Sequence, residues 1–321
     1  MLEKLPKMKD SMNGCYYYLY QGFSVHKAMF KVVISFQHYF LAHDDDIVLA
    51  SCPKSGTTWL KALTFAILNR NRFSLKDSPL LNANPHDLVP VLGHLSDLNS
   101  QPKDLENTKP RLYIAPFWCE NCTKLVFMVG DGLMHPCHQP SRILISAKLW
   151  TFVETLWTFL SQLGMLYPLI LVKTLSQMMS KIFFDLFCRG IHPYGSCWDH
   201  ILGFWSASLE EPDKVLFPKY KDLKRDNVSC IKKVAEFVGF PFSLEEEKQG
   251  MLEELKILEV NKNGKHPVGI PYSSLFRKGE VGDWMNYLTS SMIERAHKLM
   301  EDKFRGSNST FELSPHAHKS P

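Results

Sequence analysis

The sequence predicts an α/β fold, and two adjoining patterns support that prediction. Residues 47–50 form a short apolar run, which is typical of a buried parallel strand. Residues 59–68 then show helical periodicity, with one apolar face made of Leu60, Leu63, Ala66 and Ile67. At 321 residues, of which 45% are hydrophobic, the chain can bury a large core, and a single α/β domain is common at this length.

The loop between that strand and that helix has the composition of an anion-binding turn. A strand, a small-residue loop and a helix together direct free backbone N–H groups and a positive helix end at an anion. Lys54 adds a mobile charge, and Ser55, Thr57 and Thr58 add hydroxyl donors around Gly56. The loop predicts a site for a phosphate-like group, with an ordinary strand-to-helix turn as the alternative. The nucleoside-triphosphate pattern G-x-x-x-x-G-K-[ST] is absent, because the lysine precedes the glycine.

The composition favours a small anionic ligand over a nucleic acid or a membrane. The net charge of +4 is too weakly basic for a nucleic-acid surface. Residues 1–7 lack the apolar core of a signal peptide. The longest apolar stretch, residues 163–172, is broken by Gly164 and Pro168 and is too short to cross a bilayer. We therefore expect a cytoplasmic protein, and reduced thiols are the default for its eight scattered cysteines in that compartment.

Helical and strand patterns continue in the second half of the chain. Amphipathic helices are expected over residues 198–205, 229–241 and 290–306. The apolar positions of the first two are Ile201, Leu202 and Trp205, and then Ile231, Val234, Phe237 and Val238. Residues 214–223 are expected to form a strand followed by a turn, although Pro218 would remove a ladder hydrogen bond there. The tail, residues 307–321, is expected to be loose.

A second candidate anion site lies near the C-terminus, at residues 276–284. Arg277 offers a planar fork and Lys278 a point charge, a pair suited to a phosphate monoester. Gly279 lets the backbone approach that group closely. An Arg-Lys-Gly run by itself is usually solvated surface, so the wider pattern Arg-Lys-Gly-x-x-Gly-Asp-Trp carries the prediction.

Both anion sites resemble signatures of the plant cytosolic sulfotransferases: Pro-Lys-Ser-Gly-Thr-Thr-Trp at residues 53–59 and the Arg-Lys-Gly pattern at 277–284. The resemblance implies a single domain with the P-loop-like sulfotransferase fold, a central parallel sheet flanked by helices. It implies transfer of a sulfuryl group from 3′-phosphoadenylyl sulfate (PAPS) to a hydroxyl of a small metabolite such as a flavonoid or a steroid. This chemistry needs no metal. Residues 1–46 would be an N-terminal arm and residues 47–306 the sulfotransferase domain.

The resemblance also assigns roles to individual residues. Lys54 is the expected catalytic residue, because it can stabilise charge on the leaving phosphate. Tyr220 is expected to contact the adenine ring. Arg277, Lys278 and Gly279 are expected to bind the 3′-phosphate. The residues expected to hold the 5′-phosphosulfate are Lys54, Ser55, Gly56, Thr57, Thr58 and Trp59. His86 lies in a segment, residues 84–90, that resembles plant members of the family, and we interpret it as structural rather than catalytic.

The middle of the chain, residues 117–150, departs from the family pattern. Pro116 stands where the family has its general-base histidine, and proline cannot accept a proton. The Arg/Ser pair that binds the 3′-phosphate is also missing. His135 or His138 is then a candidate for a displaced base, and an altered exon would also produce such a break. The alternative hypothesis is a catalytically impaired nucleotide-binding protein with the same fold.

The same segment contains residue types that could bind zinc, namely Cys119, Cys122, His135, Cys137 and His138. Their spacing matches no standard zinc site, so we interpret them as a chance grouping and predict no metal. The aromatic residues of the N-terminal arm, residues 1–46, either pack on the core or line an acceptor pocket, and packing is the favoured interpretation. The sequence leaves the oligomeric state open.

Overall fold

The structure is a computed structural model. It describes residues 2–9, 16–20, 23–27, 30, 34, 45–51, 56–89, 112–115, 124–128, 181, 184–185, 187–190, 196–258, 260–264, 272–275 and 288–307.

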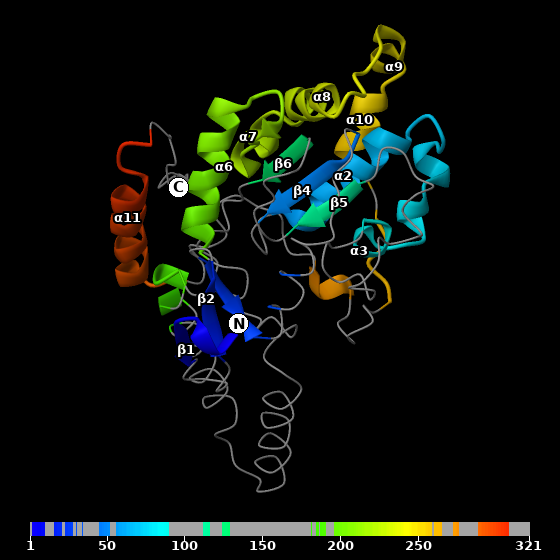
Figure 1. The fold of residues 1–321 in the computed structure, drawn as a ribbon. Helices are drawn as coiled ribbons and strands as arrows, with labels where there is room; N and C mark the ends of the chain where they lie inside the picture. The colour runs from blue at the N-terminus through cyan, green and yellow to red at the C-terminus, as the bar shows by residue number, and fades with distance from the viewer. Residues whose placement is uncertain are drawn as a thin grey trace, which may run out of the picture.

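A parallel sheet lies at the centre of the described chain, in the strand order β5-β4-β6-β7. Figure 1 labels β4 between β5 and β6. The strands are β4 (Ile47–Ser51), β5 (Leu112–Ala115), β6 (Lys124–Met128) and β7 (Val215–Leu216). β4 pairs with both neighbours, so that Ile47 is opposite Leu112 on one side and Lys124 on the other. All five residues of β4 are buried, which confirms the buried parallel strand expected there.

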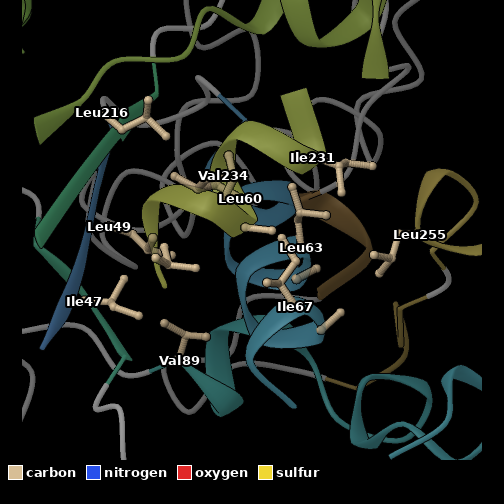
Figure 2. Packing of buried hydrophobic residues seen from close by; sticks show 14 of the residues in the cluster. Ile47, Leu49, Leu60, Leu63, Ile67, Val89, Leu216, Ile231, Val234 and Leu255 are labelled. Atoms are coloured by element: carbon tan, nitrogen blue, oxygen red, sulfur yellow. The ribbon is translucent and has the colours of Figure 1, made fainter. Parts of the chain in front are cut away.

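Helix α2 (Thr57–Asn69) follows β4 and packs on one face of the sheet. Its buried residues include Leu60, Leu63, Ala66 and Ile67, the apolar face that the sequence predicts. Figure 2 shows Leu60, Leu63 and Ile67 in one cluster with Ile47 and Leu49 of β4. Since full burial of a Leu or Ile side chain contributes about 1.5–3 kcal/mol, this contact holds α2 against β4.

The same core cluster is completed by helices from the C-terminal half. α8 (Asn227–Phe237) contributes Ile231 and Val234, and α10 (Met251–Lys256) contributes Leu252 and Leu255. α9 (Leu244–Lys248) begins with a capping box formed by Ser243 and Glu246. The helix predicted over residues 229–241 ends earlier than expected. α8 ends at Phe237, shortly before Gly239, which has a φ of 84°.

Helix α6 (Cys197–Glu210) lies beside the C-terminal helix α11 (Ser290–Phe304) (Figure 1). The Trp198 and Phe304 rings are 5.9 Å apart, and Trp205 Nε1 donates to the Ser307 carbonyl at 2.9 Å. The prediction for α6 was partly wrong. Ile201 is buried as expected, but the other buried apolar side chains are Trp198 and Phe204, while Leu202 and Trp205 are half-buried.

The strand predicted over residues 214–223 is much shorter than expected. β7 ends at Leu216, and helix α7 (Tyr220–Arg225) begins four residues later. Pro218 therefore lies after the strand and removes no ladder hydrogen bond.

The N-terminal arm forms a separate antiparallel sheet from β1 (Lys7–Lys9), β2 (Tyr16–Tyr20) and β3 (Phe23–His26). Figure 1 shows this sheet apart from the central one. Tyr18, Val25 and Phe30 form its small core, which supports the packing interpretation for these residues. The short helices are η1 (Leu2–Lys4), η2 (Leu75–Asp77), η3 (Pro79–Leu81), α3 (Pro85–Leu88) and η6 (Tyr272–Leu275). Within the described residues, no helix has the length and apolarity needed to span a membrane.

Candidate functional site

The candidate site lies at the carboxyl end of β4, next to a reversal in the strand order. The chain continues from β4 to β5 on one side, whereas β6 continues to β7 on the other. In open α/β sheets, ligands bind at the carboxyl ends of strands where the order reverses in this way. β6 comes from the segment that departs from the family pattern, yet it pairs with β4 over five residues. That part of the segment therefore contributes a regular strand to the sheet.

The two ends of the anion-binding turn are placed by the structure, while Lys54 and Ser55 lie outside the described residues. Ser51 Oγ at the end of β4 lies 2.6 Å from Thr57 Oγ1 at the start of α2, so a hydrogen bond closes the turn. Gly56 has a φ of 91°, in the left-handed region that glycine adopts without strain. Gly56 caps α2 without a side-chain hydrogen bond, and the backbone N–H groups of a helix's first turn have no partner within the helix, which suits them to an anion.

Thr58, in the first turn of α2, contacts the short helix α3. Its Oγ1 lies 3.0 Å from His86 Nε2, and the other ring nitrogen, Nδ1, lies 3.2 Å from Lys61 Nζ. Lys61 also donates to the Val89 carbonyl at 3.0 Å. α3 is fixed by its N-cap, because the buried Asn84 accepts from the His86 backbone N–H at 3.1 Å.

Lys61 is fully buried, and burial lowers its pKa to about 7, while the charge of Asp87 acts in the opposite direction. Asp87 Oδ1 in turn accepts a hydrogen bond from the hydroxyl of Tyr272. Burial and then this carboxylate raise the pKa of Tyr272 to about 12. We call Thr58, Lys61, His86, Asp87 and Tyr272 the Lys61 cluster. It joins α2, α3 and η6 directly beside the anion-binding turn.

The remaining predicted site residues are placed only in part. Trp59 is half-buried and packs against the main core cluster. Tyr220 is the first residue of α7, is also half-buried, and lies below Lys224, whose Nζ is 5.5 Å from the ring centroid. Arg277, Lys278 and Gly279 lie outside the described residues.

The divergent segment is mostly outside the described residues too. This applies to Pro116, His135 and His138, and to the cysteines considered for zinc. Among the residues that are described, no group of three or more His, Cys, Asp and Glu side chains is arranged to hold a metal ion. The absence of a metal and the choice of His135 or His138 as the general base therefore stay predictions.

Sequence reasoning missed Lys61, Asp87 and Tyr272, and it gave His86 only a structural role. The sequence carries no clear signal for Lys61, because only the structure shows that α2 buries every residue from Leu60 to Thr64. The contacts of Lys61 with His86 and Val89 join positions 25 and 28 residues apart, and no local pattern reports such pairs.

Among the described residues, a parallel sheet whose strand β4 leads through a glycine-containing turn into α2 defines an α/β protein of the kind that commonly binds anions at a helix start. Comparison with known proteins narrows this class. A sulfotransferase domain matches residues 44–132 and 145–308, and the chain belongs to the sulfotransferase family. The enzyme class and the fold predicted from the sequence are thereby confirmed.

Individual relatives agree with this assignment. Cytosolic sulfotransferase 15 of Arabidopsis thaliana is 38% identical over 98% of this chain and 87% of its own length. Flavonol 3-sulfotransferase of Flaveria bidentis is 36% identical over 89% of this chain and 90% of its own length. A crystal structure of an Arabidopsis thaliana candidate steroid sulphotransferase has a TM-score of 0.65 at 30% identity, covering 97% of this chain and 94% of that one. A mouse sulfotransferase complexed with PAP (adenosine 3′,5′-bisphosphate), at 21% identity and a TM-score of 0.56, shares the fold.

Proposed function

We propose that this sulfotransferase transfers a sulfuryl group from PAPS to a hydroxyl of a small metabolite. The observation that carries the proposal is the turn between β4 and α2, where Gly56 and the Ser51–Thr57 hydrogen bond present an uncapped helix start at the carboxyl edge of the sheet. A phosphosulfate matches this site in charge and in its need for hydrogen-bond donors. The mouse relative complexed with PAP supports the same choice of donor.

The proposed donor site extends from this turn across the sheet edge. Lys54 and Ser55, with the first turn of α2 from Gly56 to Trp59, hold the 5′-phosphosulfate. Arg277, Lys278 and Gly279 hold the 3′-phosphate at the opposite end of the donor, and the ring of Tyr220 contacts the adenine. Tyr220 follows β7 on the same edge of the sheet as the turn, because all four strands are parallel.

The proposed reaction is a single displacement at sulfur. The acceptor oxygen forms a bond to sulfur, and the bond from sulfur to the phosphate oxygen breaks. The electron pair stays on the phosphate of adenosine 3′,5′-bisphosphate, where Lys54 stabilises the added charge. The hydroxyl proton goes to a general base, for which His135 and His138 are the candidates. No metal takes part in these steps.

The relatives narrow the proposed acceptor and location. The Flaveria relative is named for a flavonol, and several Arabidopsis relatives are named as cytosolic enzymes. We therefore favour a flavonoid or another hydroxylated metabolite of that size as the acceptor, and the cytoplasm as the location.

A turnover assay with labelled PAPS and a panel of flavonols, steroids and simple phenols tests this function. We expect labelled sulfate esters from at least one acceptor, and at least a tenfold lower rate for Lys54→Ala, since a hydrogen bond to a charged group contributes about 1.5–3 kcal/mol. If every acceptor gives no product while the chain binds adenosine 3′,5′-bisphosphate, the catalytically impaired alternative is correct instead.

A further inference from the structure

The Lys61 cluster contains a fully buried lysine for which the proposed reaction gives no role. We propose that His86 is a positioning residue, held by Lys61, that fixes the Thr58 hydroxyl as a hydrogen-bond donor toward the phosphosulfate. The inference rests on the proposed function, because it requires a sulfate donor bound at the start of α2.

The geometry is a continuous chain of hydrogen bonds across one turn of α2. Lys61 Nζ lies 3.2 Å from His86 Nδ1, and His86 Nε2 lies 3.0 Å from Thr58 Oγ1. Thr58 and Lys61 are three residues apart, so they lie on the same face of the helix. The imidazole therefore bridges a buried side chain and one that stands beside the anion-binding turn.

Donor and acceptor counts set the direction of each bond while Lys61 is protonated, at or below its pKa of about 7. An ammonium group has three donors and no acceptor, so in this state Lys61 can only donate, and His86 Nδ1 accepts. A neutral imidazole with an accepting Nδ1 carries its hydrogen on Nε2, and it donates that hydrogen to Thr58 Oγ1. The hydroxyl hydrogen of Thr58 is then directed away from His86 and remains available to a bound anion.

The surroundings keep this arrangement in place. Lys61 is anchored by the Val89 carbonyl, and α3 is anchored through Asn84, whose Nδ2 donates to the Asn261 carbonyl at 2.9 Å. Among the residues that the structure describes, the ionisable groups around Lys61 are His86 and Asp87 from α3, and Asp87 is held in turn by Tyr272 from η6. Second-layer contacts of this kind commonly orient the groups that touch a ligand.

A thermodynamic cycle on binding of adenosine 3′,5′-bisphosphate tests the inference. We expect His86→Leu and Thr58→Val each to weaken binding about tenfold, the value of one positioned hydrogen bond. The double variant should bind no more weakly than Thr58→Val alone, because His86 acts through that hydroxyl. His86→Gln places an amide donor near the position of Nε2 and should restore most of the affinity. If the double variant lost affinity by the product of the two single losses, the inference would be overturned.

Two further measurements separate this inference from the proposed function and from misfolding. Lys54 lies outside the cluster, so Lys54→Ala tests the proposed function separately. If wild type binds adenosine 3′,5′-bisphosphate and Lys54→Ala binds it more weakly, the function holds. If the effects of His86→Leu and Thr58→Val are additive in the same experiment, the inference fails. If wild type does not bind, the function fails. Nitrogen NMR of labelled histidine in wild type, with His86→Gln to identify the signal, reads the tautomer directly. We expect hydrogen on Nε2, and hydrogen on Nδ1 would overturn the inference even if a variant fails to fold.

Discussion

Replacing Lys61 by methionine isolates the free-energy cost of burying an ammonium group in the core. The side chain is fully buried, and its pKa falls from the ordinary value of 10.5 to about 7. Since one pKa unit corresponds to about 1.36 kcal/mol, the difference between 10.5 and about 7 makes protonated Lys61 cost on the order of 5 kcal/mol of folding stability.

The sign of the pH dependence follows from proton binding. Between about pH 7 and pH 10.5 the unfolded chain keeps a proton on Lys61 that the folded chain has lost. Stability from this residue therefore rises with pH across that window, and the full cost is present below it. Methionine has no such proton, so its advantage over lysine should be largest near neutral pH and should shrink as the pH rises. The Val89 carbonyl, which loses its partner, offsets about 1–3 kcal/mol of that advantage at every pH.

Urea denaturation of wild type and Lys61→Met at several pH values across the window measures this difference. Taking the difference between the two proteins cancels the titration of Tyr272 and other shared groups. We expect it to change by several kcal/mol, in favour of wild type, as the pH rises. A difference that stays constant across the window would refute the reasoning, because Lys61 would then titrate alike in the folded and unfolded chains.

Three other perturbations test the structural account. Gly56→Ala forces a side chain into a φ of 91°, and should cost about 1–2 kcal/mol in thermal melting; an unchanged melting temperature would contradict the left-handed turn. Arg70→Met removes a 2.6 Å ion pair with Glu246 and a hydrogen bond to the Pro241 carbonyl, and should cost about 2–3 kcal/mol in denaturant unfolding. Arg225→Met, at an exposed pair, is its control and should change stability by less than about 0.5 kcal/mol; equal losses would refute the contrast. Arg70 also holds the pKa of Glu246 below its ordinary value. The stability that this carboxylate contributes is therefore present above its ordinary pKa and is lost as the pH falls through its lowered pKa. Glu246→Gln should make the free energy of unfolding depend less on pH in this acidic range.

The fold was predictable where the pattern was local and regular. The strand at residues 47–50 was readable because it is a continuous apolar run, and the face of α2 because its apolar residues repeat with the helical period. The prediction failed at residues 214–223, where the apolar run Val215-Leu216-Phe217 resembles a strand but Pro218 follows, and the chain turns into α7 instead.

The site was predictable in its first element and not in its supporting shell. The composition of the turn at residues 53–58 indicates an anion by itself. The Lys61 cluster depends on contacts between distant positions, such as Tyr272 with Asp87, which are 185 residues apart. His86 was expected to be structural, and the structure adds that its ring lies against Thr58 of the turn. The assignments of Lys54, Tyr220 and Arg277 stay predictions.

Calorimetric titration with adenosine 3′,5′-bisphosphate tests the central claim most directly. The claim is that the turn after β4 and the Arg277–Gly279 segment bind opposite ends of one donor. We expect wild type to bind, and Lys54→Ala and Arg277→Ala each to weaken binding about tenfold or more, as loss of a charged hydrogen bond implies. Binding that neither substitution changes, or no binding by a folded wild-type chain, would contradict the claim.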